Sequence, residues 1–328
     1  MDLSIVIVNF RGWKRLRQCL ESLSCLSDAP FTWEVIIVDN QSNDGQLGSF
    51  EYEFQHFTFV ENTGNNGFAN GCNVGAAQST GTFLLFLNPD TIANLHALKK
   101  LMVTALKNPD LTILTCHQLN DKGKDTKPYG LFVRPGTLTS LFRSVYRLTH
   151  NHLPQIQLQS GEKALSPEWV SGSAIFIKRT NFNQLGGWCE DYWMYFEDAD
   201  LCKRVRNTGG QLALLTEISI THNHGGASRI NPVTKALTKS EVLISKHVYI
   251  SKHFSGITRS LMQAYMVVDN LFISHLLISL AGLLLFFVPS INAYTKLYAN
   301  LVRYYRHAIS NKTWLSPRSM SFRQLAKK

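Results

Sequence analysis

A carboxylate at the end of a short apolar run is the clearest sign of chemistry in this sequence. Phe83–Leu87 are all apolar, and Asn88, Pro89 and Asp90 follow at once. The run is typical of a central parallel strand, and proline stops strands. We therefore expect Asp90 at the carboxyl end of a strand, the edge where open α/β sheets bind ligands. A carboxylate there suits a divalent cation that carries a phosphorylated substrate. The alternative is a turn that ends the strand and caps a helix from Thr91.

Asp39 is a second carboxylate that closes an apolar run. It follows Val35–Val38, which is typical of another buried strand. A carboxylate at this place can accept a hydrogen bond from a nucleotide base or ribose. If it meets the imide N–H of a pyrimidine, the base is uracil or thymine, because cytosine has an acceptor at that atom. The alternative is a turn cap that Ser42 and Asn43 complete.

Glycines recur at every fourth position in one segment, at Gly67, Gly71 and Gly75, with Asn66 and Asn73 nearby. On a helix, this spacing leaves one face bare, so that backbone or a ligand can approach closely. The segment lacks the phosphate-loop lysine and does not match the dinucleotide fingerprint. The alternative is tight packing of the helix on a sheet.

Three acidic residues, Glu197, Asp198 and Asp200, fall within four positions late in the chain, and aromatic residues crowd the segment before them. Carboxylates are costly to bury beside aromatic side chains. The arrangement makes sense if one of them is held ready as a base. The alternative, an acidic helix N-terminus that the helix dipole favours, accounts for Glu197.

Two histidines, His222 and His224, stand at the end of a strand-like segment and precede glycines. A lone histidine is usually structural. Two histidines two positions apart at a strand end, followed by glycines, are candidate metal ligands.

Strand and helix signals alternate through most of the chain at the spacing of βαβ units. The expected strands are Leu3–Asn9, Trp33–Asp39, Phe57–Glu61, Phe83–Leu87, Leu111–Cys116, Trp169–Ile177, Gln211–Leu215 and Ile218–His222. The expected helices are Lys14–Leu26, Gly67–Ser79, Leu95–Lys107, Arg179–Leu185 and one that starts near Glu197. The alternation predicts an α/β fold with a doubly wound, mostly parallel sheet and helices on both faces.

The positive charge of the chain lies in its last hundred residues. Residues 1–228 hold 19 Lys/Arg and 21 Asp/Glu, a balance of −2, whereas residues 229–328 hold 14 and 2, a balance of +12. The same stretch contains Leu271–Val288, whose only non-apolar members are two serines, a histidine and a glycine. A basic and apolar tail favours contact with an anionic membrane over nucleic acid.

The apolar segment of the tail is at the short end for a span of about 20 residues. Basic residues lie on both sides of it, which favours a helix or hairpin in the membrane interface over a single crossing. The alternative is a buried helix at a homo-oligomer interface. The six cysteines show no C-x-x-C spacing, and Met1 opens no secretory signal. We therefore expect reduced thiols and a cytosolic location for the catalytic part.

Taken together, these motifs resemble family 2 glycosyltransferases of the GT-A fold. The most similar branch is the rhamnosyltransferase-like one that builds bacterial cell-surface polysaccharides. The resemblance covers about residues 3–228. It implies a catalytic domain at 1–228, with a nucleotide-sugar-binding half at 1–116, a variable insert at 121–166 and an acceptor and catalytic half at 167–228. The helical tail at 229–328 would associate with the membrane.

The resemblance also implies roles for single residues. Asp198 would be the catalytic base, with Glu197 beside it. The nucleotide sugar would be bound by Asp39, Asn66, Gly67, Asn73, Asn88 and Asp90, with Asn88 in the place of the first aspartate of the D-x-D motif. The acceptor side would be formed by Trp188, Glu190, Asp191 and Tyr192. Mg²⁺ or Mn²⁺ would be held by Asp90 with His222 or His224.

The implied reaction is inverting transfer of a sugar, such as rhamnose, from a dTDP- or UDP-sugar to a hydroxyl of a lipid-linked glycan. It would take place on the cytoplasmic face of the inner membrane of a bacterium. A sugar nucleotidyltransferase would need a glycine-rich basic loop after the first strand, and Asn9–Lys14 has one glycine. A catalytically inactive membrane-bound scaffold is the other alternative, and the presence of Asp39, Asp90 and Asp198 argues against it.

Overall fold

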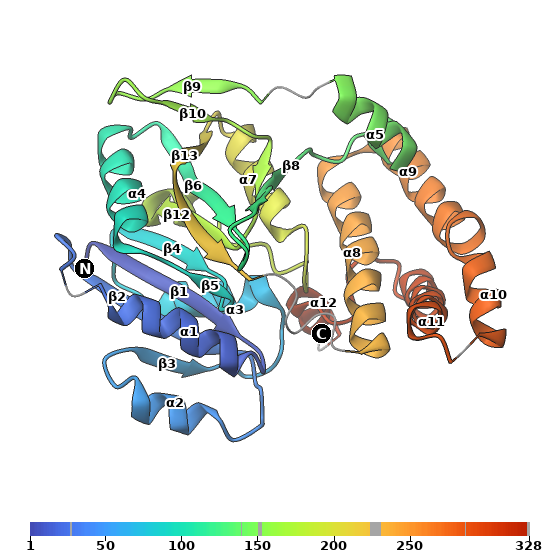
Figure 1. Cartoon of the computed structure of the whole chain (residues 1–328). Coiled ribbons are helices and arrows are strands. Elements are labelled where there is room, and N and C mark those ends of the chain that lie inside the picture. The colour runs from blue at the N-terminus through green and yellow to red at the C-terminus, as the bar shows by residue number, and fades with distance from the viewer. Residues whose placement is uncertain (27, 139, 150–152, 224–230, 286, 327–328) are drawn as a thin grey trace. The chain divides into compact units, whose positions relative to one another are not determined.

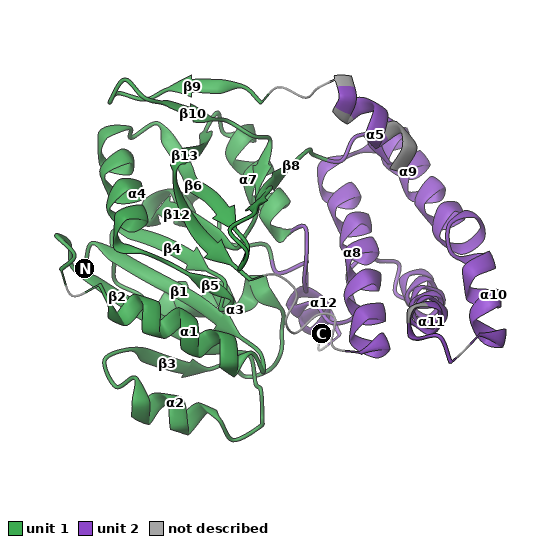
Figure 2. Ribbon diagram, viewed as in Figure 1, with its two compact units in different colours: residues 1–132, 152–189, 197–224 green, residues 133–151, 190–196, 225–328 purple. Residues whose placement is uncertain are grey.

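The computed structural model describes residues 1–26, 28–138, 140–149, 153–223, 231–285 and 287–326. The chain separates into two compact units (Figure 2). The first, here called the sheet unit, comprises residues 1–132, 152–189 and 197–224, and the second, the helical unit, comprises 133–151, 190–196 and 225–328. The division expected between residues 228 and 229 falls outside the described residues.

The sheet unit alternates strands with helices (Figure 1). Its strands are β1 (Leu3–Asn9), β2 (Trp33–Asp39), β3 (Thr58–Glu61), β4 (Phe83–Leu87), β5 (Thr91–Ile92), β6 (Leu111–Leu119), β7 (Asp125–Thr126), β8 (Tyr129–Gly130), β9 (Gln155–Gln157), β10 (Lys163–Leu165), β11 (Trp169–Val170), β12 (Ala174–Lys178) and β13 (Gln211–His222). Its helices are α1 (Trp13–Ser24), α2 (Leu47–Glu53), α3 (Phe68–Gln78), α4 (Leu95–Lys107), α6 (Arg179–Gln184) and α7 (Glu197–Asn207).

The main sheet is mixed and mostly parallel in its central part. Its strands follow the order β3-β2-β1-β4-β12-β6-β13-β10-β9. Strands β1, β2, β3 and β4 are parallel, as are β6 and β13, whereas β12 runs antiparallel between β4 and β6. The α/β fold with helices and a mostly parallel sheet is thus confirmed, with β12 as the reversed strand.

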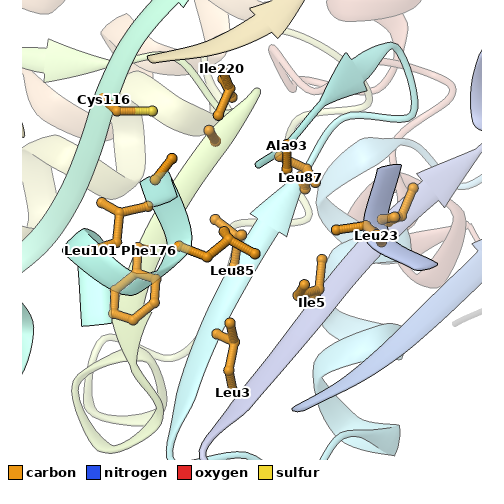
Figure 3. Packing of buried hydrophobic residues seen from close by; sticks show 14 of the residues in the cluster. Leu3, Ile5, Leu23, Leu85, Leu87, Ala93, Leu101, Cys116, Phe176 and Ile220 are labelled. Atoms are coloured by element: carbon orange, nitrogen blue, oxygen red, sulfur yellow. The ribbon is translucent and has the colours of Figure 1, made fainter. Parts of the chain in front are cut away.

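Successive side chains of a strand point to opposite faces of the sheet, and helices cover both faces. In β1, Leu3, Ile5 and Ile7 point to the face covered by α1, α2 and α4, and they join the largest apolar cluster (Figure 3). Val6 and Val8 point to the opposite face, against which α3 packs. A Cβ added to Gly71 would contact Val8, and one added to Gly75 would contact Val6. All seven residues of β1 are buried, as expected of a central strand with helices on both sides.

Several element boundaries differ from the sequence prediction. The segment expected as one strand at Trp169–Ile177 forms β11 in a separate small sheet and β12 in the main sheet. The two strands expected at 211–215 and 218–222 are one strand, β13, with an irregularity between Leu215 and Ser219. The variable insert at 121–166 contains β7 to β10, for which no strands were predicted. Helix α2 and the short β5 were not predicted.

The helical unit is built from helices. They are η1 (Pro135–Thr137), α5 (Ser140–Thr149), α8 (Pro232–His253), α9 (Gly256–Val268), the π-helical turn η2 (Asp269–Ile273), α10 (Leu276–Leu284), α11 (Pro289–Ser310) and α12 (Met320–Leu325). Of these, α8 and α11 have 22 residues each. Helix α8 packs against α11 and α9, and α10 packs against α11. A Cβ on Gly282 would lie 1.9 Å from Thr295 Oγ1, so α10 and α11 approach closely at this glycine.

Buried polar side chains join the helices of this unit. The ring of His247 stacks on Trp314 with centroids 4.8 Å apart, and its Nε2 lies 2.9 Å from Tyr305 Oη. Gln263 contacts Nδ1 of the same ring, and Asn270 Nδ2 donates to Tyr305 Oη at 2.8 Å. Desolvation lowers the pKa of His247 to about 4, so this ring is neutral near pH 7.

One helical stretch among the described residues, Gly256–Leu284, is long and apolar enough to cross a membrane, by length and composition alone. Its mean hydropathy reaches 1.8 over eighteen residues, and 17% of that window is buried. We call the exposed large apolar residues of this stretch the apolar stripe. The stripe consists of Ile257, Leu261, Val268, Phe272, Ile273, Leu277, Leu280, Leu283 and Leu284. Because most of the stretch is exposed, it is not a core helix of this unit.

Candidate functional site

The register of the strands brings the predicted chemistry to one edge of the main sheet. Asn9 at the end of β1 pairs with Asp39 at the end of β2. Ala174, which begins the antiparallel β12, pairs with Leu87, which ends β4. The edge therefore combines the carboxyl ends of three parallel strands with the amino end of β12, as expected for a ligand site in an open α/β sheet.

Asp90 and His222 meet because a short strand follows the Asn-Pro-Asp turn. Thr91 of β5 pairs antiparallel with His222 at the end of β13. As a result, Asp90 Oδ1 lies 3.2 Å from His222 Nε2. On its other side, Asp90 Oδ2 accepts from Arg15 of α1 at 3.3 Å, and the same guanidinium donates to the Asn223 carbonyl at 2.6 Å. The carboxylate is thus fixed between a guanidinium and an imidazole.

A buried polar chain fixes the ring of His222 from the other side. Nδ1 of His222 lies 2.7 Å from Gln118 Oε1. Since an amide oxygen only accepts, Nδ1 carries the hydrogen. Gln118 Nε2 donates to Ser173 Oγ at 2.7 Å, and Ser173 Oγ donates to Ser171 Oγ at 3.0 Å. Gln118 was not predicted as a site residue, because the strand was expected to end at Cys116 and nothing in the local sequence marks a lone glutamine.

This arrangement suits a divalent cation. With Nδ1–H donating to Gln118, His222 directs Nε2 toward Asp90 Oδ1 at 3.2 Å, a separation that a proton or a cation can bridge. An Asp oxygen and an imidazole nitrogen held by a second hydrogen bond are typical metal ligands. Within the described ranges, no group of three or more His, Cys, Asp and Glu side chains converges. Substrate oxygens would have to complete the coordination.

Asp39 is buried and tightly bound within its own turn. Its Oδ2 accepts from the Ser42 backbone N–H at 2.8 Å, its Oδ1 contacts the Ser42 hydroxyl, and Asn9 Nδ2 donates to it at 3.3 Å. These contacts match the turn cap that the sequence left open as an alternative. Binding of a base by Asp39 stays a prediction.

Helix α3 packs on the sheet through its glycines. A Cβ on Gly71 would lie 2.7 Å from Val8 Cγ1, and one on Gly75 would lie 2.4 Å from Val6 Cγ1. The bare helix face is therefore used for packing, the second of the two interpretations. Gly67 precedes the helix with φ +99°, a conformation that favours glycine.

A network of buried asparagines surrounds the start of α3. Asn40 Nδ2 donates to the Gly67 carbonyl at 3.0 Å, and Asn62 Nδ2 donates to the side chains of both Asn40 and Asn70 at 2.9 Å. Asn66 is 5% exposed in the same stretch. Of these asparagines only Asn66 was predicted, because the contacts of the others join segments up to 27 residues apart.

Asn73 positions the Gly-Gly-Trp segment. Its side chain donates to the Trp188 carbonyl and accepts from the Trp188 N–H, both at 2.9 Å. Gly186 and Gly187 both have positive φ, which explains the two glycines. Trp188 is 1% exposed and stands edge-on to Phe86, with centroids 5.2 Å apart. Asn73 and Trp188 thus support each other, and their contacts with substrates stay predictions.

The acidic cluster begins α7, and its carboxylates lie in different environments. Asp198 is half-buried, and its carboxylate accepts from the backbone N–H groups of Gly172 and Ala199 at 3.1 and 2.7 Å. Because Gly172 precedes β12, this contact ties Asp198 to the sheet edge. Asp200 is fully buried in an ion pair with Arg204 at 2.7 Å, which is a structural role.

Burial gives Glu197 and Asp198 the properties of a coupled acid pair. Glu197 is 7% exposed, and desolvation raises its pKa well above the usual range, with the charge of Asp198 adding to the rise. Desolvation also raises the pKa of Asp198, against the lowering effect of the Gly172 and Ala199 N–H groups. A carboxylate with a raised pKa is a better general base near neutral pH.

Five buried side-chain atoms in the described part of the sheet unit have no hydrogen-bond partner. They include Glu197 Oε2 and Trp188 Nε1 and, in addition, His117 Nδ1, Arg204 Nη2 and Asn223 Oδ1. Unsatisfied polar atoms cost free energy in a folded protein, so they are expected where a ligand completes the site. The backbone just before Glu197 is strained as well, because Tyr195 and Phe196 have φ of 71° and 67°. Such strain is common at functional sites.

The remaining predicted residues lie elsewhere. Asp191 forms an ion pair with Lys252 at 2.6 Å in the helical unit, and the Glu190 carbonyl accepts from Ser321 N–H at 3.4 Å. Tyr192 is completely buried. Their acceptor roles stay predictions. His224, the alternative metal ligand, lies outside the described residues. Asn88 is half-buried, and its backbone N–H donates to the Ser173 carbonyl at 2.9 Å.

Comparison with protein families identifies the sheet unit. The profile of the family described as "Glycosyl transferase family 2" matches residues 4–169, which is more than half of the chain. The matched range includes Asp39 and Asp90, and it ends before the acidic cluster at Glu197.

Curated relatives are distant in sequence. The chain is 26% identical over 227 residues to the low-salt glycan biosynthesis hexosyltransferase Agl10 of Haloferax volcanii, covering 68% of this chain and 67% of that protein. It is 21% identical over 280 residues to the N-acetylglucosaminyl-diphospho-decaprenol L-rhamnosyltransferase of Mycobacterium tuberculosis, covering 77% and 85%. It is 22% identical over 267 residues to the rhamnosyltransferase WbbL of Escherichia coli, covering 77% and 97%.

Among solved structures, the mannosyltransferase PcManGT of Pyrobaculum calidifontis, in complex with GDP-Man and Mn²⁺, is similar over 92% of this chain and 84% of its own. The TM-score is 0.52 and the sequence identity 15%. At this identity, the similarity shows a shared fold.

Proposed function

The chain belongs to glycosyl transferase family 2, and from this premise we propose that it moves a sugar from a dTDP- or UDP-sugar to a hydroxyl of a lipid-linked glycan, with inversion at the anomeric carbon. The observation that carries the proposal is the sheet edge at which Asp90, His222 and, through Gly172, Asp198 are held. Rhamnose is the favoured sugar, because two of the relatives are rhamnosyltransferases.

Asp198 would act as the base. It would accept the proton of the acceptor hydroxyl as the oxygen attacks the anomeric carbon and the bond to the diphosphate breaks. Burial raises the pKa of Asp198 and favours this proton transfer. Asp200 is occupied by Arg204, and burial raises the pKa of Glu197, which disfavours the ionised form that a nucleophile needs. A single displacement by one base gives inversion, whereas glycoside hydrolysis needs a pair of carboxylates bracketing the bond.

Asp90 and His222 would hold Mg²⁺ or Mn²⁺, with Gln118 fixing the ring of His222. When bound, such a cation stabilises negative charge on the departing diphosphate. PcManGT, which shares the fold, was solved with Mn²⁺. Arg15 lies beside Asp90 and supplies a fixed positive charge at the same place.

The apolar stripe would lie in the membrane interface on the cytoplasmic side of a bacterial inner membrane. Its opposite face packs in the helical unit through polar residues, as Gln263 and Asn270 contact His247 and Tyr305. A crossing by this stretch alone would strip these polar groups of their partners in lipid, at a high cost. A one-sided apolar helix suits the interface instead.

A donor screen tests the proposed function. Purified chain is incubated with dTDP-rhamnose, UDP-glucose, UDP-N-acetylglucosamine and GDP-mannose, and thermal unfolding is measured with and without Mn²⁺. A bound donor raises the unfolding temperature in proportion to the logarithm of its concentration over Kd. We expect stabilisation by dTDP- or UDP-sugars and release of the matching nucleoside diphosphate when acceptor is present. Stabilisation by none of the four would contradict the proposal.

A further inference from the structure

The helical unit contains an open pocket of about 680 Å³ that no part of the proposed chemistry uses. Every residue that lines it belongs to this unit. Three basic side chains contribute to the wall, Lys252 at the end of α8, Arg259 on α9 and Lys312 after α11. Asp191 is the one acidic residue among the lining residues, so the formal charge of the pocket is +2.

Two of the three cations are available for a ligand. Lys252 is paired with Asp191 at 2.6 Å. Arg259 and Lys312 are exposed, and neither has an ion-pair partner in the part of the chain that the structure describes. Two unpaired cations converging on one pocket attract a doubly charged anion, and a diphosphate matches that charge.

The rest of the pocket wall combines the polar residues Ser251, Ser260, Gln263 and Thr313 with apolar ones. Val248 of α8, Val267 of α9, and Trp314 and Leu315 after α11 line it. Trp314 is held in place by stacking on His247. A pocket that joins two free cations to aliphatic and indole surface suits an amphiphile better than a free inorganic anion.

The pocket borders the apolar stripe on the surface of α9. Residues three and four apart are neighbours on a helix. Ala264 lines the pocket and has Ser260 and Val267 of the pocket wall as such neighbours, while Leu261 and Val268 of the stripe stand at the same distances from it. A molecule with its head in the pocket can therefore lay its hydrocarbon chain along the stripe.

We propose that this pocket binds the diphosphate head of a membrane-borne lipid diphosphate, with Arg259 and Lys312 contacting the phosphate oxygens. The inference rests on the proposed function, since it gives the lipid-linked acceptor a binding site in the helical unit.

The test measures binding of farnesyl diphosphate to the full chain by titration calorimetry, at constant salt. Inorganic diphosphate, farnesol, and vesicles of phosphatidylcholine with one-fifth phosphatidylglycerol are the comparison ligands. The pocket variant is Arg259→Gln with Lys312→Gln. The matched control is Arg303→Gln with Arg306→Gln, which removes the same charge from exposed positions on α11 outside the pocket.

We expect farnesyl diphosphate to bind the wild type and the control equally, and the pocket variant at least about tenfold more weakly. Inorganic diphosphate and farnesol should bind much more weakly than farnesyl diphosphate. Equal binding by inorganic diphosphate, or an equal loss in both variants, would overturn the inference. A loss confined to phosphatidylglycerol vesicles would also overturn it, because it would assign the pocket to bulk anionic lipid.

The outcome is separable from that of the donor screen. Farnesyl diphosphate binding needs no nucleotide sugar, and the substituted residues lie outside the sheet unit. Donor stabilisation without lipid binding would overturn the pocket assignment and leave the proposed glycosyl transfer standing.

Discussion

In the sheet unit, Asp39, Asp90 and His222 stand at strand ends, where a few adjacent residues in the sequence identify them. In the helical unit, the basic residues of the pocket come from the end of α8, from α9 and from the turn after α11. The first site can be recognised from short motifs, because a strand end has a fixed place at the sheet edge. The second emerges only from the packing of helices, because composition indicates an apolar and basic surface without indicating which residues converge.

The largest effect is expected from removing the proposed catalytic base of the sheet unit. Asp198→Asn keeps the size of the side chain and removes its basicity, so we expect kcat to fall by about 10²–10⁴ with donor binding unchanged. Glu197→Gln is the matched control one residue away, and a smaller effect is expected. If Glu197→Gln lost most of the activity while Asp198→Asn kept it, the roles within the pair would be reversed.

The same carboxylate predicts a pH dependence. The base must be unprotonated, so activity is lost as pH falls through the pKa of Asp198. Because burial raises that pKa above its ordinary value of 3.8, the acid limb of the profile of kcat/KM should lie at higher pH than for a solvated aspartate. An acid limb that persists unchanged in Asp198→Asn would assign it to another group.

Substitution of Gln118 tests whether metal binding at the sheet edge depends on a residue outside the sequence motifs. Gln118→Leu removes the acceptor that holds Nδ1–H of His222, and we expect Mn²⁺ binding, measured by electron paramagnetic resonance, to weaken by about 10–100-fold. Gln118→Glu retains an acceptor and should restore most of the affinity. Equal weakening in both variants would mean that Gln118 acts only through packing. Unchanged Mn²⁺ affinity in Gln118→Leu would separate this residue from the metal.

The apolar stripe tests the helical unit. Leu277→Ser with Leu284→Ser removes two side chains that are 75% and 79% exposed. We expect flotation with anionic vesicles to weaken by about tenfold or more, because each buried leucine contributes roughly 1.5–3 kcal/mol. Val103→Ser with Leu106→Ser on α4, exposed positions of the sheet unit, should leave vesicle binding unchanged. Equal weakening of vesicle binding in both double variants would show that the stripe contributes no more than other exposed apolar residues.

The smallest effect concerns the packing beneath the site. Gly75→Ala would place a Cβ 2.4 Å from Val6 Cγ1, and we expect a loss of about 1–3 kcal/mol in unfolding free energy. Gly48→Ala in α2 meets nothing within 4 Å and should be neutral or slightly stabilising. Urea unfolding compares the two. A stable Gly75→Ala variant would show that α3 can shift away from the sheet.

The sequence determined the strands that are buried on both faces. The bounds of β1, β2 and β4 follow from apolar runs closed by Asn9, Asp39 and Asn88. Asp90 and His222 were predicted together because each ends a recognisable run. These features are local, because a continuous apolar run is typical of a strand that is buried on both faces in the middle of a sheet.

Tertiary structure decided what depends on partners far apart in the chain. Strand β12 runs antiparallel to both of its neighbours, β4 and β6. The spacing of apolar residues in the sequence does not indicate the direction in which a strand runs. The contact of Gln118 with His222 spans 104 residues, and the ion pair of Asp191 with Lys252 spans 61. A polar residue inside an apolar strand looks the same in sequence whether its partner is a histidine, a substrate or water. Only the register that brings the partner to it gives the residue its role.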